Sequence, residues 1–344
     1  MLFYWLLFSI PVFMLFANGR KEYQSLGVSF GIFLIIVIGL RFQVGGDWYT
    51  YLDGVDLYSG VSLDDVLLLK FEVGFNILSW VSQQMGASIY GVNLVCAIIF
   101  VIGFTKFSNS QPYPWLATTV AVPYLIVVVA MGYTRQAAAI GFLMLSFGYL
   151  LRGRLIKYLA LVMLATSFHK TAIIFLALPL FQPGGGRIRF IFGLISIFIL
   201  SSLTIVIEQA ETLYLHYVEE NMESGGGLIR VLMNLPPALI LFTNWKKWNE
   251  KYIDRWLWTC IALLALGCIP LVSMASTAVD RMALYLIPFQ LVAWSRLPAL
   301  LAWNYERVAF AITLFYATVL FVWISYGNFS SSWIPYNNLL IPSF

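Results

Sequence analysis

Residues 115–151 read WLATTVAVPYLIVVVAMGYTRQAAAIGFLMLSFGYLL. Two apolar stretches, 115–131 and 136–151, flank the short sequence Gly-Tyr-Thr-Arg, and Arg135 is the only charged side chain in the whole segment. Each stretch comes close to the roughly 20 apolar residues that a helix needs to cross a bilayer. The segment therefore predicts two transmembrane helices joined by a tight turn.

The rest of the chain has the same character. Hydrophobic residues make up 61% of the 344 residues, charged residues 10%, and the mean hydropathy is +0.85. A soluble domain is about 25% charged, so these few charges could not cover a globule of this size. The composition excludes a soluble enzyme, a nucleic-acid-binding protein and a disordered protein. It predicts an all-α, polytopic integral membrane helical bundle that forms a single transmembrane domain over 1–344.

Apolar stretches of similar length along the whole sequence predict about twelve spans. They are 2–17, 26–41, 88–104, 115–131, 136–151, 156–167, 170–182, 189–208, 228–243, 256–273, 281–296 and 304–326. The pair 156–167 and 170–182 is either one long helix or two short helices that meet at 167–170. Residues 66–85 are amphipathic and interrupted by Lys70 and Glu72, which predicts a short interfacial or re-entrant helix.

The distribution of charge predicts the orientation. Cytoplasmic loops of membrane proteins are enriched in Lys and Arg. With two short helices over 156–182, most basic residues fall on one side and most acidic residues on the other. We therefore expect the polar stretches 41–65 and 208–227 to be external loops, and both termini to face outward.

Cysteine and histidine give no sign of a metal site. Cys96, Cys260 and Cys268 lie in apolar runs without CxxC spacing, and we expect them to be packing residues. His169 and His216 are far apart in the sequence. No P-loop, HExxH or GxSxG motif is present. We predict neither a metal nor a cofactor.

Residues 41–51, Arg-Phe-Gln-Val-Gly-Gly-Asp-Trp-Tyr-Thr-Tyr, form the first candidate site. Gly45 and Gly46 allow tight backbone geometry, and Asp47 stands beside aromatic residues that include Tyr51. Carboxylates for hydroxyl groups and flat rings for apolar sugar faces suit a carbohydrate site. The alternative is an interface loop with an aromatic belt, anchored by Arg41.

Further candidates lie at the predicted outer ends of other spans. Arg135 precedes Gln136 in the tight turn, and an arginine there could instead extend to lipid headgroups. His169 and Lys170 interrupt an apolar stretch, where ionisable groups are costly; a structural histidine is the alternative. Arg281 follows Asp280, with Tyr285 one turn later, and Arg230 starts another span. Several cations on a side where they are disfavoured predict a site for an anion such as a lipid diphosphate.

The order of four motifs resembles a known family. IGLRFQVGGDWYTYL (38–52), FEVGFNILSWV (71–81), GYTRQAAAIGF (132–142) and LATSFHKTAIIFL (164–176) together resemble the EpsG-like family of Wzy-type polysaccharide repeat-unit polymerases, and the C-terminal half is similar in DRMALYLIPF (280–289). The family's motif positions fall on Arg41, Gly46, Asp47, Tyr51, Glu72, Arg135, Gln136 and His169.

The resemblance implies a multi-pass glycosyltransferase of the bacterial inner membrane with a GT-C-like fold and an active site facing the periplasm. Its donor and acceptor would be undecaprenyl-diphosphate-linked oligosaccharides of O-antigen or exopolysaccharide biosynthesis. No nucleotide sugar or nucleic acid would take part. A flippase and a chain-length regulator of the same pathway are the implied protein partners.

Roles follow from the chemistry of this reaction. A departing diphosphate gains negative charge, which guanidinium groups stabilise, and the acceptor hydroxyl needs a base. The predicted catalytic residues are Arg135 for the diphosphate and either His169 or Asp47 as base. The predicted substrate-binding residues are Arg41, Tyr51, Glu72, Gln136, Lys170, Arg281 and Tyr285.

Two rival functions differ in their expected signatures. A membrane O-acyltransferase that modifies cell-surface sugars would need polar residues at inner helix ends for a cytoplasmic acyl donor, and the inner loops are short and simply basic. A lipid-linked oligosaccharide flippase or other transporter would favour internal repeats and midplane charges, and the sequence displays neither.

Overall fold

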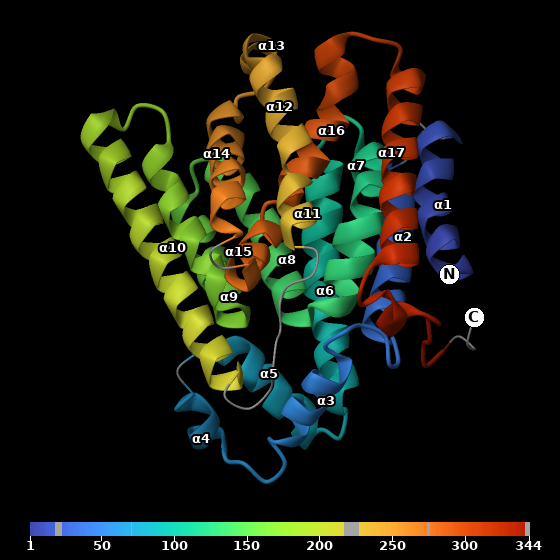
Figure 1. The fold of residues 1–344 in the computed structure, drawn as a ribbon, viewed down its shortest axis with the longest axis vertical. Helices are drawn as coiled ribbons and strands as arrows, with labels where there is room; N and C mark the ends of the chain where they lie inside the picture. Colours follow the sequence, from blue (N-terminus) through green and yellow to red (C-terminus); the bar gives the residue numbers. More distant parts are fainter. Residues whose placement is uncertain (18–22, 70, 217–226, 274–275, 341–344) are drawn as a thin grey trace.

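The computed structural model describes residues 1–17, 23–69, 71–216, 227–273 and 276–340 (Figure 1). The described part is helical, and its one β-bridge joins Arg41 to Asn338. The elements are α1 (Leu2–Ala17), α2 (Tyr23–Gly39), α3 (Trp48–Asp56), α4 (Leu63–Leu67), α5 (Val73–Gln84), α6 (Ser88–Asn109), α7 (Pro114–Ala121), the π-helix η2 (Val122–Ala130), α8 (Thr134–Leu151), α9 (Leu155–Phe168), the 3-10 helix η3 (Lys170–Phe181), α10 (Gly186–His216), α11 (Gly227–Leu232), α12 (Leu235–Thr243), α13 (Trp245–Lys251), α14 (Arg255–Leu271), α15 (Ser276–Leu284), α16 (Ile287–Leu301), α17 (Tyr305–Tyr326) and the 3-10 turn η4 (Ser330–Trp333).

Each of the twelve predicted segments contains a helix. Of the two alternatives for 156–182, the structure has the two short helices, because α9 ends at Phe168 and η3 begins at Lys170. By length and composition, three helices of the described residues could cross a membrane, or five if each of two bent helix pairs is one span; six further apolar helices have 10–17 residues. The count of twelve spans and the GT-C-like architecture therefore stay predictions.

The two stretches expected to be external contain helices, and their position outside the membrane stays a prediction. Residues 41–65 contain α3 and α4, because Trp48, Tyr51 and Val55 share a buried helical face and the Ser62 hydroxyl accepts the Asp65 N–H at 3.2 Å to cap α4. Residues 208–216 continue α10, and 217–226 lie outside the described residues. The amphipathic helix predicted near 66–85 is present as α5, which begins at Val73.

The bundle has two distinct ends, here named by the short helices that they carry (Figure 1). The α3–α5 end carries α3, α4 and α5. The opposite α13 end carries α13, together with the helix termini that contain Lys106, Arg154, Arg255 and Arg307. These four basic residues, which the charge pattern predicts to share one side, thus share one end.

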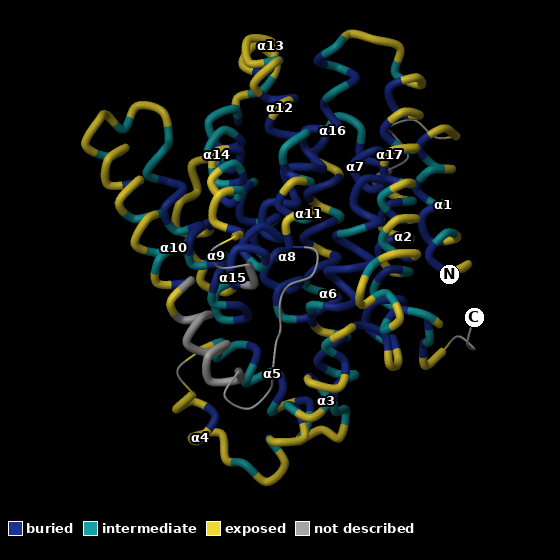
Figure 2. The backbone as a smooth tube through the Cα atoms, in the orientation of Figure 1, coloured by how far each residue is buried: buried dark blue, intermediate teal, exposed yellow. Residues whose placement is uncertain are grey.

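Close helix contacts form the centre of the bundle. A Cβ atom on Gly103 of α6 would lie 2.1 Å from the carbonyl oxygen of Gly141 in α8, so these backbones touch, as small residues permit in membranes. Every residue of α7 is buried. Figure 2 shows this buried centre and the exposed outer surface of α10, where apolar side chains such as Phe192 and Phe198 suit contact with lipid.

The C-terminal segment fixes the loop that precedes α3. Three backbone hydrogen bonds of 2.9–3.0 Å join 40–45 to 332–339. The indole of Trp333 donates to the Val127 carbonyl at 2.8 Å and packs beside this loop. Gly45 has φ +112°, and a Cβ there would lie 2.4 Å from the Met131 carbonyl oxygen. The predicted need for glycine is therefore confirmed at Gly45.

Candidate functional site at the α3–α5 end

Arg135 lies at the centre of the candidate site, in the first turn of α8. Its Nη1 contacts Glu72 Oε2 at 2.5 Å, and its guanidinium lies 5.5 Å from the ring centroid of Tyr51 and 5.6 Å from that of Phe75. Its side chain remains 36% exposed, although its Nε–H is buried and has no hydrogen-bond partner among the described residues. An anionic ligand can therefore bind the exposed part of the Arg135 guanidinium while the contact with Glu72 keeps the side chain in position.

Glu72 links α8 to the break between α9 and η3. It lies before α5 with φ +54°, a left-handed conformation that is costly for a side chain other than glycine. One carboxylate oxygen contacts Arg135, and the other accepts the backbone N–H of Lys170 at 3.3 Å. Since both oxygens are engaged, Glu72 fits a positioning role better than that of a base.

His169 occupies the break itself. Its extended backbone, φ −150° and ψ +116°, ends α9. The ring is buried, its Nδ1 lies 2.7 Å from the hydroxyl oxygen of Thr171, and its centroid is 6.0 Å from that of Tyr285. If Nδ1 donates to this hydroxyl, Nε2 keeps a lone pair that could accept a substrate proton. His169 can therefore serve as a base in that tautomer.

The charges around His169 are positive. Arg135, Arg281 and Lys170 all act on it electrostatically. The Nζ of Lys170 lies 5.7 Å from the Phe71 ring centroid. These three cations come from α8, α15 and the start of η3, so the fold collects positive charge from separate parts of the chain.

Asp47 faces the same cations from the loop before α3. Its side chain makes no capping hydrogen bond. Burial raises the pKa of Asp47 above its usual value, and the positive charges of Arg281 and Arg135 oppose this shift. A half-buried carboxylate of raised pKa is a suitable proton acceptor, so the structure keeps both candidate bases at one site.

Gln136 and Tyr285 position neighbouring elements. The Gln136 side-chain amide donates to the backbone carbonyl of Arg281, which ties α8 to α15. Tyr285, one turn after Arg281, packs against His169 and lies 5.8 Å from the Phe175 ring centroid. These two predicted substrate-binding residues therefore hold Arg281 and His169 in the cluster.

Arg41 has a different environment from the other predicted residues. Its guanidinium is buried and donates to the carbonyls of Ile38 and Val44 at 2.6 and 3.1 Å, and to Asn93 Oδ1 and Thr134 Oγ1 at 3.0 and 2.7 Å. These bonds fix the turn between α2 and the Asp47 loop. Direct substrate binding by Arg41 stays a prediction, whereas its contacts indicate that it positions the loop.

The structure contains two ion pairs that the sequence did not predict. Arg230 Nε lies 2.8 Å from Asp280 Oδ1, and its Nη1 donates to the Tyr133 hydroxyl at 3.4 Å, beside the site. The adjacent motifs Asp280-Arg281 and Gly132-Tyr133 were the only signals for this contact. At the α13 end, Arg296 pairs with Asp254, and no motif marked either residue.

Within the described ranges, no group of three or more His, Cys, Asp or Glu side chains is placed to hold a metal ion. All three cysteines are free, and Cys96 and Cys268 are buried, which fits their predicted role in packing.

The fold and the site define a class: a membrane protein of apolar helices with a cationic, aromatic-lined polar site at one end. The sequence model of the EpsG family matches residues 25–338. The chain therefore belongs to the EpsG family, which is associated with membrane polysaccharide polymerases. The matched range includes every residue of the candidate site. No curated protein and no solved structure matches the chain.

Proposed function

We propose that this protein is a glycosyltransferase that polymerises undecaprenyl-diphosphate-linked oligosaccharide repeat units for a bacterial surface polysaccharide. Membership of the EpsG family supports a membrane polysaccharide polymerase. The observation that carries the finer proposal is the environment of Arg135: a guanidinium whose side chain is 36% exposed, with a single carboxylate contact and two flanking rings. Such a group suits a diphosphate attached to a sugar.

The proposed reaction exchanges one C–O bond for another. The bond between the anomeric carbon of the donor glycan and its diphosphate oxygen breaks, and the diphosphate keeps the electron pair. A hydroxyl oxygen at the non-reducing end of the acceptor repeat unit bonds to that carbon, and its proton passes to His169 or Asp47. The products are a longer glycan on the acceptor lipid and free undecaprenyl diphosphate.

The residues of the candidate site have different roles in this reaction. Arg135 and Arg281 offset the charge that develops on the diphosphate, with Lys170 beside them. The buried Tyr51 ring packs against the Arg135 guanidinium, and Glu72 holds Arg135 against the His169 segment. Gln136 and Tyr285 hold Arg281 and His169 in place.

A reconstituted reaction tests the proposal. Purified protein in lipid nanodiscs should convert the lipid-linked repeat unit alone into a glycan ladder, with one undecaprenyl diphosphate released per linkage and no nucleotide sugar required. Arg135→Lys should shorten or abolish this ladder. Arg307→Lys, at an exposed arginine of the α13 end, is its matched control and should leave the ladder unchanged. Acyl transfer, or lipid movement across the bilayer without chain growth, would favour an O-acyltransferase or a flippase instead.

We also propose that the α3–α5 end faces the periplasm and the α13 end the cytoplasm, because the basic helix termini gather at the α13 end. In a variant lacking Cys96, Cys260 and Cys268, a cysteine at exposed Asp56 should react with an impermeant thiol reagent in intact cells. A cysteine at Lys246 should react only after lysis. The reverse pattern would invert the orientation.

The proposed partners follow from this orientation. A flippase of the same pathway would deliver the lipid-linked repeat units to the periplasmic leaflet. A chain-length regulator would set how many additions occur before the glycan leaves.

A further inference from the structure

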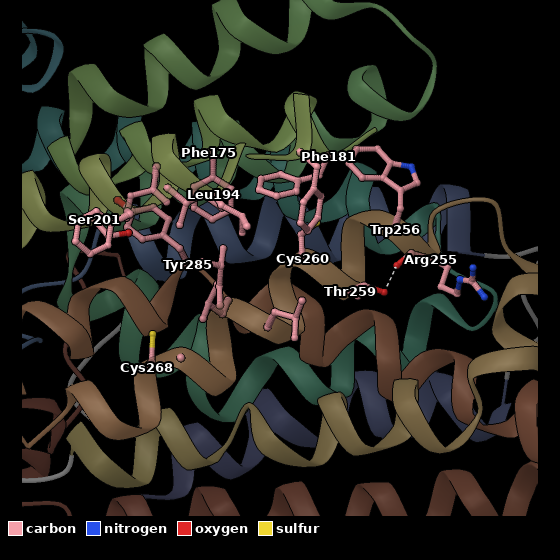
Figure 3. A pocket seen from close by; sticks show the side chains of 18 of the residues that line it. Phe175, Phe181, Leu194, Ser201, Arg255, Trp256, Thr259, Cys260, Cys268 and Tyr285 are labelled. Carbon is pink, nitrogen blue, oxygen red and sulfur yellow. Dashed lines mark hydrogen bonds between the residues drawn. The ribbon is translucent and has the colours of Figure 1, made fainter. Parts of the chain in front are cut away.

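An apolar groove runs along the outside of α14. It has a volume of about 660 Å³ and lies between η3, α10, α14 and α15 (Figure 3). Its walls are mostly aromatic and aliphatic, with Phe175, Leu194 and Leu264 among the lining residues. The hydroxyl of Thr259 in its wall is already bonded to the Arg255 carbonyl at 2.8 Å. The groove therefore offers little to a polar ligand along its length.

The groove extends over most of an apolar layer. Arg255 and Leu271, the first and last residues of α14, both line it. At a rise of about 1.5 Å per residue, these 17 residues cover roughly 24 Å, which approaches the roughly 30 Å hydrocarbon thickness of a bilayer. A ligand that filled the groove would be a long, flexible apolar chain.

One end of the groove meets the cationic site. Tyr285 lines the groove and also packs against the His169 ring, with centroids 6.0 Å apart. Met282, the neighbour of Arg281, lines it as well. The opposite end, near Arg255 and Trp256, lies far from Tyr285 in Figure 3. An apolar channel thus ends beside a cluster of positive charge.

We infer that the groove binds the polyisoprenyl tail of the donor lipid diphosphate. The inference rests on the proposed function and adds where the donor lies. With its tail against α14, the donor presents its diphosphate to Arg281 and Arg135 beside Tyr285. The acceptor sugar would then lie near Asp47, which faces the same two arginines from the loop before α3. A single long chain with an anionic head matches both the shape and the charge of this arrangement.

A groove-filling substitution tests the inference. Gly267 lines the groove, and a Cβ there would meet no atom within 4 Å, so Gly267→Trp fills space without displacing backbone. Leu314→Trp is the control, because Leu314 is 59% exposed on α17, away from the groove. Binding is measured in nanodiscs with two probes: a sugar-free long-chain polyprenyl diphosphate and inorganic diphosphate.

We expect Gly267→Trp to weaken polyprenyl diphosphate binding at least tenfold and to leave inorganic diphosphate binding unchanged, while Leu314→Trp binds both like the wild type. Wild-type affinity of Gly267→Trp for the long-chain probe would overturn the inference. Displacement of that probe by phosphatidylglycerol as readily as by unlabelled polyprenyl diphosphate would overturn it as well, because the groove would then hold ordinary lipid.

A second measurement uses only the wild-type chain, in case Gly267→Trp fails to fold. A polyprenyl diphosphate with a diazirine at the end of its tail should label peptides of η3, α10, α13 or α14, which line the groove, and labelling confined to other helices would overturn the inference. Neither experiment requires polymerisation. Tail binding without chain growth would defeat the proposed function alone, and full polymerisation by Gly267→Trp would defeat the groove alone.

Discussion

Two arginine–carboxylate ion pairs lie at opposite ends of the bundle, and they differ in burial and in the number of contacts. At the α13 end, Arg296 meets Asp254 through two contacts of 2.7 and 2.6 Å, and the side chains are only 6% and 8% exposed. Tyr252 and Trp248 flank the guanidinium, with ring centroids 4.0 and 5.1 Å away. Trp258 donates to the same carboxylate at 2.8 Å.

The pair at the α3–α5 end is more open. Arg135 meets Glu72 through one contact, and 36% of the arginine side chain is exposed. Its flanking rings are also farther away, at 5.5 and 5.6 Å. A closed pair resists a ligand and stabilises the fold, whereas an open pair leaves donors for a ligand. The difference separates a structural cluster from a candidate active site.

The largest expected effect comes from removing the base at the open end. A positioned base contributes about 10²–10⁴-fold in rate, so His169→Ala or Asp47→Asn should stop chain growth at single lipid-linked repeat units while donor binding is retained. Both purified variants are compared with the wild type in polymerisation rate and melting temperature. At least one should combine near-normal stability with a loss of a hundredfold or more. If both are stable and fully active, neither is the base, and Glu72 is the next carboxylate to test.

At the closed end, Asp254→Asn should act on stability instead. Removing one partner of a buried ion pair leaves an uncompensated charge and costs about 3–5 kcal/mol. The melting temperature should fall clearly, while the polymerisation rate per folded molecule stays near that of the wild type. A normal melting temperature combined with lost activity would remove the contrast between the ends.

A smaller effect is expected from pH. Burial raises the pKa of Asp47, so a role that requires its carboxylate would be lost as pH falls through a midpoint above that of an exposed aspartate. The raised pKa changes stability with pH in the opposite direction. It favours the protonated Asp47 side chain in the folded protein, and this stabilising contribution is lost as pH rises through the pKa of Asp47 in the folded state. At neutral pH, Asp47→Asn should therefore melt no lower than the wild type and should lack the acidic limb of the rate profile.

Hydropathy and short motifs predicted the local parts of this structure. The helices fall where apolar stretches do, and the break at His169 follows from polar residues inside such a stretch. Four motif residues, Tyr51, Glu72, Arg135 and His169, come from separate segments of the chain and still lie in one cluster. Intramembrane ionisable groups are expensive, and the need to share a polar environment gathers them.

Contacts between distant segments were beyond sequence reasoning. Arg296 and Asp254 are 42 residues apart, and hydropathy does not indicate which helix ends meet. The C-terminal residues hold the Asp47 loop through backbone hydrogen bonds. Such bonds need no particular side chains, so the sequence gives no sign of them. Arg41 looked like an anion site, yet its donors are taken by carbonyls and amide oxygens that only the folded turn brings near. The groove along α14 depends on helix spacing, which composition does not encode.

The most direct test compares the same substitution at both ends. Lysine keeps the charge of arginine but loses its planar, two-pronged set of donors. For Arg135→Lys, the polymerisation rate per folded molecule should fall by about a hundredfold or more, as for loss of a donor to developing negative charge, with a near-normal melting temperature. For Arg296→Lys, the melting temperature should fall and the rate per folded molecule should hold. Full activity of Arg135→Lys, or equal destabilisation by both substitutions, would contradict the assignment of the active site to the α3–α5 end.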